Sequence, residues 1–394
     1  MTNAKSRPAP LPPEAYWKPE WFEAEQRTLF RDSWLLAGIK QDLANHNDYI
    51  STTVATVPII VRNMRGELIA FHNICSHRHS LIHAKGKGNA PFRCMFHGWM
   101  YGPDGVPVAI PDNDRAFQFE KSDRETLALK RVAVESCGNF VFVRLAPEGL
   151  SLKEFLGPLF PRLEAITTRF DILYGKHEAT WACNWKPGIE VTLEAYHLPY
   201  VHAGSLANHI GNPQNLPTAI VGPDEPYGHT DYFGLHSTTI SAMSKTSTDQ
   251  LSMIANGLRL QRNELISAYD HYFIYPNLML SVSGDAVACA ELYEPIGPGQ
   301  TAVTWWLTTS RPEDPSICGS PDWNYAMTEL SNWTKTVMSE DHIVCEGVQI
   351  GVRHAEKHGC LGVPEERIHH LQQNILDALN AENPTKTATL ARIA

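Results

Sequence analysis

The chain has 394 residues, of which 43% are apolar and 19% are charged, a balance typical of a globular protein that buries a core. This length allows two domains or one large domain. The formal net charge of −10 argues against a nucleic-acid-binding protein, and no apolar run approaches the ~20 residues that cross a bilayer.

The N-terminal residues, MTNAKSRPAPLPPEAYW, are rich in proline and lack the apolar core of a secretory signal. We therefore expect a short arm that is disordered or lies on the surface. The next stretch, residues 18–35, indicates a helix because its large apolar side chains recur at close to helical spacing: Trp21, Phe22, Leu29, Phe30 and Trp34.

The texture changes from Asp48 to about Leu145, where short β-rich runs alternate with turn signals such as Arg65-Gly66. This pattern predicts a small antiparallel β-domain. Residues 150–170 indicate a helical connector. Strand-like runs follow, and two helical stretches, 323–356 and 364–381, come last. Strands followed by flanking helices predict a larger α+β domain.

The eight cysteines are spread widely along the chain, whereas secreted disulfide scaffolds are smaller and denser in cysteine. We therefore expect a reducing cytoplasm and mostly buried free thiols. Cys75 and Cys94 differ from the others because each has a histidine nearby.

These two cysteines belong to a paired motif, Cys75-x-His77 followed after sixteen residues by Cys94-x-x-His97-Gly-Trp. Each half follows a predicted strand, so two loops can close on one centre. Both tetrahedral zinc and a Rieske [2Fe–2S] cluster use two cysteines and two histidines. Zinc fingers normally pair cysteine with cysteine and histidine with histidine. Here each loop offers one of each, as a Rieske cluster requires.

The motif therefore resembles that of Rieske proteins. In the respiratory type each loop carries a further cysteine, and the two form a disulfide; the matching positions here are Ser80 and Phe96. The resemblance thus implies the low-potential branch that delivers electrons to oxygenases. The other histidines near the loops are not expected to bind metal: His72, His79 and His83. Arg78 is expected to support its loop by hydrogen bonds.

A second motif, Glu194-x-x-His197-x₄-His202, follows in the longer C-terminal part. Residues five apart on an ideal helix point about 140° apart, but Pro199 interrupts the helix just after His197 and allows the imidazoles to converge. Two imidazoles and one carboxylate form the facial triad of non-haem Fe(II) oxygenases. Taken alone, the motif is more typical of core or surface histidines than of metal ligands.

Together the two motifs resemble the large (alpha) subunit of Rieske non-haem iron ring-hydroxylating oxygenases over nearly the whole chain. The resemblance implies Asp341, in the stretch SEDHIVCEGVQ, as the third iron ligand. Glu340 and Glu346 are the other acids of this stretch, and we interpret them as solvated or capping acids on the face of the helix. Glu194 takes the position of an acid that bridges an iron histidine, His197, and a cluster histidine of the neighbouring subunit.

Supporting and pocket residues are less sharply indicated. Tyr196 and Asn184 are expected to be supports of the iron ligands or plain core residues. The substrate pocket is expected after the second histidine and along the later sheet, with aromatic candidates at His209, Phe233, His236 and Trp306. Arg259 or Arg262 would clamp a substrate carboxylate or belong to a solvated helix face.

The resemblance implies an α+β fold in three parts. Residues 1–40 form an N-terminal arm and helix that pack with the catalytic domain. Residues 41–160 form a small antiparallel β Rieske domain, and residues 161–394 form the catalytic domain, a helix-grip-like antiparallel sheet with helices.

The implied function is that of a terminal oxygenase component, with one Rieske [2Fe–2S] cluster and one mononuclear Fe(II) per subunit. A separate NAD(P)H-dependent reductase or ferredoxin is expected because no Gly-x-Gly-x-x-Gly follows a strand. A head-to-tail homotrimer is implied, with or without a β subunit. The expected substrate is a small, aromatic molecule for hydroxylation or dihydroxylation; a quaternary ammonium or betaine substrate is the alternative. A non-catalytic electron carrier and a zinc-stabilised binding module are the rival classes.

Overall fold

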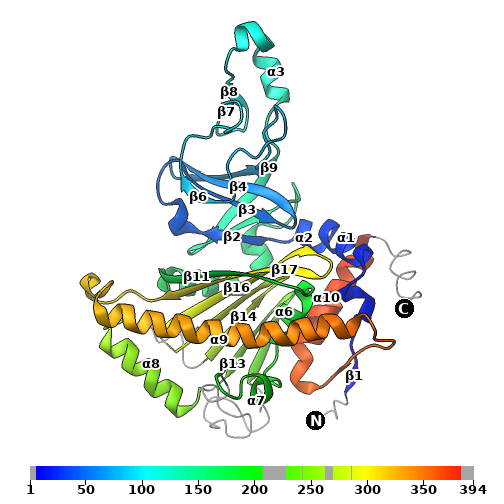
Figure 1. The fold of residues 1–394 in the computed structure, drawn as a ribbon, viewed down its shortest axis with the longest axis vertical. Coiled ribbons are helices and arrows are strands. Elements are labelled where there is room, and N and C mark those ends of the chain that lie inside the picture. The colour runs from blue at the N-terminus through cyan, green and yellow to red at the C-terminus, as the bar shows by residue number, and fades with distance from the viewer. Residues whose placement is uncertain (1–5, 207–227, 242, 262–268, 285, 383–394) are drawn as a thin grey trace. The chain divides into compact units, whose positions relative to one another are not determined.

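The computed structural model of the chain describes residues 6–206, 228–241, 243–261, 269–284 and 286–382. It divides into two compact units, one formed by Phe30–Thr167 and the other by Met1–Leu29 together with Thr168–Ala394. Each unit is built on a seven-stranded antiparallel sheet (Figure 1).

The sheet of the Phe30–Thr167 unit is antiparallel throughout. Its strands lie in the order β2 (Leu35–Ile39), β10 (Phe140–Arg144), β9 (Arg131–Cys137), β5 (Glu67–His72), β4 (Val57–Met64), β3 (Asp48–Val54) and β6 (Gly86–Asn89). Arg65 and Gly66 join β4 to β5 with φ angles of 61° and 94°, which suits a tight hairpin turn. The predicted small β-domain is therefore present.

Shorter elements complete this unit. A two-stranded ribbon, β7 (Met100–Tyr101) with β8 (Pro107–Ala109), follows the Cys94-x-x-His97 half of the first motif. The predicted connector at 150–170 forms two helices that Gly157 separates at a φ of 53°. The helical elements of the unit are η2 (Lys40–Leu43), the π-helix η3 (Asn113–Phe117), α3 (Lys121–Thr126), α4 (Leu152–Leu156) and α5 (Leu159–Arg169).

The boundaries of this unit differ from the predicted 41–160. Residues 18–35 form two helices, α1 (Pro19–Arg27) and α2 (Leu29–Asp32), and the chain then enters β2. All five side chains of β2 are buried, and the strand pairs with β10. The unit thus begins at Phe30, because the apolar run that starts at Leu35, the last residue of the predicted helix, forms a strand of its sheet.

The larger unit holds the second antiparallel sheet, with helices around it. Its strands lie in the order β11 (Ile172–Trp181), β17 (Gln300–Thr309), β16 (Val287–Gly297), β15 (Leu278–Ser283), β14 (Tyr269–Ile274), β13 (His236–Ser241) and β12 (His229–Phe233). In Figure 1 the long helix α9 (Pro321–Val352) runs across these strands, and α6 (Trp185–Thr192) lies beside it. An α+β architecture of antiparallel sheet and helices is therefore confirmed.

Helix α9 carries one acidic residue in its buried stripe. Ser320 caps the helix by accepting a hydrogen bond from the Trp323 N–H, and Pro321 occupies the first turn. The buried side chains recur at helical spacing: Trp323, Met327, Met338, Asp341, Cys345 and Gln349. A carboxylate in such a stripe needs a partner, which points to a functional role for Asp341.

From residue 6 onward, the N-terminal arm packs into the larger unit. Strand β1 (Arg7–Pro8) pairs with β18 (Cys360–Leu361), and the 3₁₀ helix η1 (Pro13–Tyr16) follows. The arm is held because its apolar side chains are buried, Leu11 among them at 1% exposure.

The remaining helices of the described residues are α7 (Leu198–Val201), α8 (Lys245–Gly257), η6 (Pro315–Ile317), η7 (Val363–Glu365) and α10 (Glu366–Glu382). None of the helices within the described ranges combines the length and the apolar character that crossing a membrane requires.

Candidate metal centres and active-site cavity

The loops 75–80 and 94–99 share one backbone conformation. In each loop the cysteine N–H donates to the carbonyl five residues later, and the N–H four residues later donates to the cysteine carbonyl, with distances of 2.8–3.0 Å. The fourth residue after each cysteine is left-handed, His79 at a φ of 60° and Gly98 at 75°. These turns bring the side chains of both loops towards one centre.

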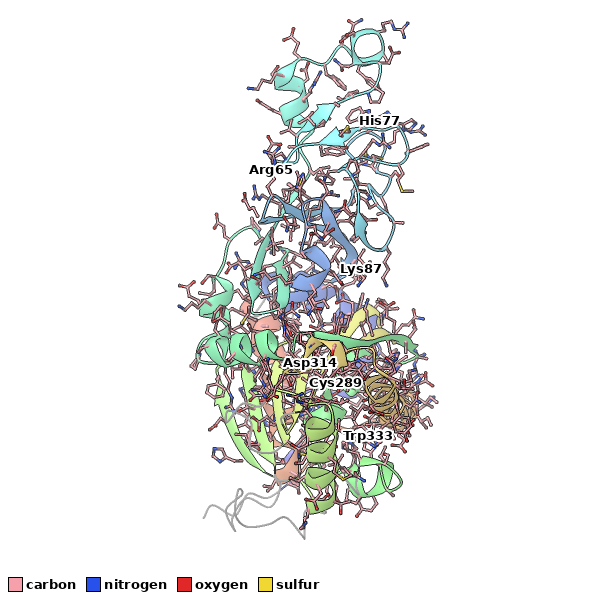
Figure 2. The ribbon with its side chains drawn as sticks, turned by 90° about the vertical axis from the view of Figure 1, so that its left-hand side faces the viewer. Arg65, His77, Lys87, Cys289, Asp314 and Trp333 are labelled. Atoms are coloured by element: carbon pink, nitrogen blue, oxygen red, sulfur yellow. The ribbon has the colours of Figure 1, made fainter. Side chains whose placement is uncertain are left out.

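The four side chains of the first motif fit a Rieske cluster. Cys75 and Cys94 are buried free thiols, and the imidazoles of His77 and His97 lie with their ring centroids 4.6 Å apart. The buried Nδ1 of His77 makes no hydrogen bond with any described residue, so its lone pair is free for a metal. Figure 2 places His77 among the loops beyond the sheet of this unit. Two thiols and two imidazoles are the donor set of a Rieske [2Fe–2S] centre.

A tyrosine missed in the sequence supports this centre. The Tyr101 hydroxyl lies 3.0 Å from the Cys75 Sγ and accepts a hydrogen bond of 3.1 Å from the Ser76 N–H. Its own proton is therefore available to the sulfur. Burial raises the pKa of Tyr101, so the hydroxyl stays protonated at neutral pH.

Other polar residues near the loops have different partners. His83 lies with Nε2 3.2 Å from the Arg62 Nη1 and stacks on Tyr49. Burial and the Arg62 charge lower the pKa of His83 to about 4. The guanidinium of Arg78 lies over the Phe96 ring, 5.4 Å from its centroid. Arg78 therefore joins the two loops by a cation–π contact rather than by the predicted hydrogen bonds.

The second motif converges through a helix break that comes earlier than predicted. Helix α6 ends at Thr192, before Glu194, and the short helix α7 (Leu198–Val201) begins after His197. Pro199 lies in the first turn of α7, where the missing N–H costs nothing. The irregular segment between the helices turns the chain, and the rings of His197 and His202 lie 5.1 Å apart.

Asp341 from α9 joins these histidines. Its Oδ1 lies 3.0 Å from the His202 Nε2 and 3.7 Å from the His197 Nε2, and one donor atom from each of the three residues lies within 4.8 Å of the others. The buried His202 Nε2 and Asp341 Oδ1 make no hydrogen bonds with the described residues. Such atoms suit a metal ion, and two imidazoles with one carboxylate match the facial triad.

Two glutamates orient the imidazoles. The His197 Nδ1 lies 2.6 Å from the Glu194 Oε1, and the His202 Nδ1 lies 2.6 Å from the Glu340 Oε2. Both histidines therefore turn Nε2 towards Asp341, as metal-bound histidines held by carboxylates do. Burial lowers the pKa of His202, but the carboxylates of Asp341 and Glu340 outweigh it, so the net shift is upward.

The other residues considered around the iron do not contact the triad with their side chains. Glu346 accepts hydrogen bonds from the Ala182 N–H and lies 2.8 Å from His342, outside the triad. Asn184 caps α6 by accepting from the Lys186 N–H. Tyr196 is 55% exposed and does not support the triad by its ring.

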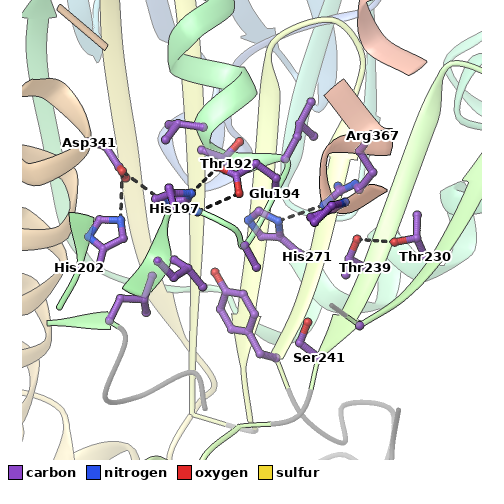
Figure 3. A pocket seen from close by; sticks show the side chains of 18 of the residues that line it. Thr192, Glu194, His197, His202, Thr230, Thr239, Ser241, His271, Asp341 and Arg367 are labelled. Atoms are coloured by element: carbon purple, nitrogen blue, oxygen red, sulfur yellow. Dashed lines mark hydrogen bonds and ion pairs between the residues drawn. The ribbon is translucent and has the colours of Figure 1, made fainter. Parts of the chain in front are cut away.

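The triad borders a cavity of about 370 Å³ in the larger unit (Figure 3). None of the described pocket candidates lines it. Phe233 follows the lining residue Tyr232 on β12, so its side chain points to the opposite face of the strand. His236 and Trp306 are buried in the core. Arg259 is exposed and pairs with Glu313 at 3.1 Å. The remaining two candidates, His209 and Arg262, lie outside the described residues.

Beside apolar residues such as Leu198, Val337 and Met338, the strands and α10 contribute polar side chains to the cavity wall. They are Thr230 and Tyr232 on β12, Thr239 and Ser241 on β13, Tyr269 and His271 on β14, Glu291 on β16, and Arg367 on α10. The lining positions on each strand are two residues apart because alternate side chains point to the same face of a sheet. This spacing reveals the lining only when it is known which face of each strand is turned towards the cavity. Burial raises the pKa of Glu291 to about 7 and lowers that of His271.

Comparison with known proteins bears on these two donor sets. The family model for the ring hydroxylating alpha subunit (catalytic domain) matches residues 172–381, and that for the Rieske [2Fe-2S] domain matches residues 33–123. The chain belongs to the ring hydroxylating alpha subunit family. The resemblance inferred from the two motifs is thus confirmed, and with it a Rieske cluster and a mononuclear iron as the cofactors of this alpha subunit.

Curated relatives of this alpha subunit act on different substrates. It is 35% identical over 199 residues to the anthranilate 1,2-dioxygenase large subunit of Acinetobacter baylyi, covering 48% of this chain but only 41% of that protein. It is 27% identical over 379 residues to the chloroplastic choline monooxygenase of Arabidopsis thaliana, covering 92% of this chain and 81% of that protein.

A solved structure shares the fold. The crystal structure of the quaternary ammonium Rieske monooxygenase CntA with an inhibitor superposes with a TM-score of 0.76 at 20% identity, covering 95% of this chain and 96% of that one.

Proposed function

We propose that this alpha subunit is a terminal oxygenase component that oxidises a small organic substrate with dioxygen and externally supplied electrons. The observation that carries the proposal is the presence of two donor sets in one chain. One is the Cys–His loop pair, and the other is a buried His–His–Asp group that borders a cavity.

In this proposal Cys75, His77, Cys94 and His97 hold the cluster, whereas His197, His202 and Asp341 hold Fe(II). When bound, the cluster would supply electrons and the iron would activate dioxygen. The chain's own groups prepare the site: Glu194 and Glu340 keep the imidazoles oriented, and the walls of the cavity hold the substrate beside the triad.

The proposed substrate is a small aromatic molecule, to be hydroxylated or dihydroxylated. The relation to an anthranilate dioxygenase supports this class. A quaternary ammonium substrate is the second candidate because the alignment with a choline monooxygenase spans 92% of the chain. Two tyrosines of the cavity wall, Tyr232 and Tyr269, could contact either an aromatic ring or an ammonium group.

We further propose a head-to-tail homotrimer, in which Glu194 faces the His97 of the neighbouring subunit. Exposed side chains at both places support it. Met95 and Phe96, beside His97, are 73% and 54% exposed, and Tyr200, near Glu194, is 77% exposed. Large apolar groups rarely gather on a free surface without a partner. All eight cysteines are free thiols, which supports the cytoplasm as the place of action.

Metal analysis and turnover together test the function. The oxygenase should contain three irons per chain and should consume dioxygen when a reductase, NADH and a substrate panel of aromatic acids, hydrocarbons and betaines are supplied. An electron carrier would contain two irons and form no product. A colourless protein that contains zinc would instead indicate the binding module.

A further inference from the structure

Arg367 is a buried arginine in the cavity wall with donor capacity to spare. It is the second residue of α10 and is 5% exposed. Its Nε donates to the Ser237 Oγ at 3.0 Å, and its Nη1 lies 3.4 Å from the His271 Nδ1. Its Nη2 is buried and makes no hydrogen bond with the described residues.

The Arg367 guanidinium has no carboxylate partner in the part of the chain that the structure describes. No carboxylate of the described residues forms an ion pair with it, although its neighbour Glu366 pairs with Arg7 at 2.5 Å. Burial lowers the pKa of Arg367 to about 10, so the group stays charged at neutral pH. An unpaired buried charge is costly, and an anionic ligand in the cavity would offset that cost.

The neighbouring imidazole is suited to this arrangement. An arginine can only donate hydrogen bonds, so the contact with Arg367 requires the His271 Nδ1 to accept. Burial and the Arg367 charge lower the pKa of His271, which keeps the imidazole neutral. His271 therefore supports the guanidinium without neutralising it.

The cavity is polarised from the triad to Arg367. Figure 3 shows Asp341 and His202 at one side of the view and Arg367 at the other, with His197 and His271 between them. Near Arg367 the wall carries hydroxyl groups, including those of Thr230 and Thr239, which lie 3.1 Å apart. The wall also contains the acid Glu291, which already accepts a hydrogen bond of 2.9 Å from the Tyr293 hydroxyl.

We propose that Arg367 binds a carboxylate of the substrate, so that this alpha subunit selects small organic acids over hydrocarbons, amines or alcohols of the same shape. The carboxylate would accept a hydrogen bond from the Arg367 Nη2, and the carbon to be oxidised would lie towards the triad. The inference rests on the proposed function, because only that function makes the bound acid a substrate. It assigns to Arg367 the carboxylate-binding role that the sequence offered as one alternative for Arg259 or Arg262.

Binding of matched probes tests the inference. The iron-loaded protein is titrated by calorimetry without dioxygen, with anthranilate against aniline and with glycine betaine against choline. In at least one pair we expect the acid to bind at least tenfold more tightly than its uncharged or cationic counterpart. If neither acid is preferred by the wild-type protein, the inference is wrong.

Three variants locate the preference. Arg367→Gln should weaken binding of the preferred acid by about 10- to 100-fold, as loss of a charged hydrogen bond does, and change binding of its counterpart by less than about twofold. Arg367→Lys keeps the charge and should retain part of the preference, which guards against a Gln variant that does not fold. Arg259→Gln, at an exposed arginine outside the cavity, should change neither Kd.

The outcomes separate this inference from the function itself. An unchanged acid preference in both Arg367 variants overturns the role of Arg367 even if the wild-type enzyme turns over. Loss of the preference in Arg367→Gln, with its partial retention in Arg367→Lys, supports that role even if no reductase-dependent turnover is found.

Discussion

At the scale of single residues, the iron site depends on a few orphaned polar atoms. The Asp341 Oδ1 is buried, makes no hydrogen bond with the described residues and lies 3.0 Å from the His202 Nε2. Such an atom is stable only with a metal ion or a proton to share.

Asp341→Ala should therefore remove the mononuclear iron and abolish turnover. The cluster should remain because its proposed ligands lie in the other unit. Iron analysis should fall from three to two per chain, while the visible absorption of the cluster is retained. Glu329→Ala, at an exposed acid of the same helix, serves as the control. Unchanged turnover in Asp341→Ala would rule out this residue as a ligand.

Glu340 was considered in the sequence as an alternative iron ligand, but its carboxylate instead lies 2.6 Å from the His202 Nδ1. Glu340→Gln should weaken iron binding by about 10- to 100-fold because a neutral amide holds the imidazole less strongly. Competition with a chelator measures the loss. Glu346→Gln removes a charge one turn or more further along α9 and should leave iron affinity unchanged; equal losses in both variants would refute a specific role for Glu340.

The Tyr101 hydroxyl is placed to donate a hydrogen bond to the Cys75 sulfur. Hydrogen bonds to cluster sulfurs stabilise the reduced, more negative state and raise the reduction potential. Tyr101→Phe should therefore lower the potential without loss of iron, as measured by a redox titration followed by absorbance. A potential that stays the same or rises would show that the hydroxyl proton is not directed at the sulfur.

At the scale of elements, helix α6 places His197, the first histidine of the proposed triad, because the start of the helix is held firmly. Lys186 and Glu25 are both fully buried, with Nζ and Oε1 2.5 Å apart, and the other Glu25 oxygen accepts from the Trp185 Nε1 at 2.8 Å. Helix α1 and helix α6 are thereby fastened together. The close packing of Gly188 against Tyr293 fixes α6 on β16, since a Cβ there would lie 2.6 Å from the ring.

Glu25→Gln should destabilise the protein by about 3–5 kcal/mol because it leaves the Lys186 ammonium buried without its partner. The double variant Glu25→Gln with Lys186→Met removes both charges and should recover a large part of that loss. Chemical denaturation of the three proteins gives the free energies of unfolding. A double variant no more stable than the single one would show that the pair is not coupled.

At the scale of the whole molecule, the proposed trimer makes a prediction that no single chain can satisfy. If electrons pass from the His97 of one subunit towards Glu194 of the next, the two metal centres that work together belong to different chains. Exposed apolar side chains beside both residues are consistent with such an interface.

His97→Ala and Asp341→Ala should each be inactive alone, but mixed trimers formed by co-expression should regain part of the turnover. In a mixed trimer an intact cluster can face an intact iron site across a subunit boundary. Reductase-dependent oxygen uptake by doubly tagged, co-purified protein measures the recovery. The absence of recovery in verified mixed trimers would mean that electrons stay within one chain.

Local sequence patterns indicated the cysteine and histidine candidates because these residues lie close together in the chain. Cys75-x-His77 and Cys94-x-x-His97 each occupy one loop, and the position of Asp341 followed from a family resemblance. The β-rich texture and the helix periodicities also predicted the fold class. The helix predicted over residues 18–35 ends instead at Asp32, and Leu35 begins a buried strand, because a short apolar run fits a helix or a buried strand equally well.

The cavity wall could not be predicted in this way. Arg367, His271, Glu291 and Thr239 come from one helix and three strands that are far apart in the sequence. The sequence by itself, through its two local motifs and the family resemblance that they carry, indicated a Rieske cluster and a mononuclear iron as the cofactors. Only the tertiary structure decided which side chains face the substrate, because a strand's register and the docking of α10 on the sheet select one face of each element for the cavity.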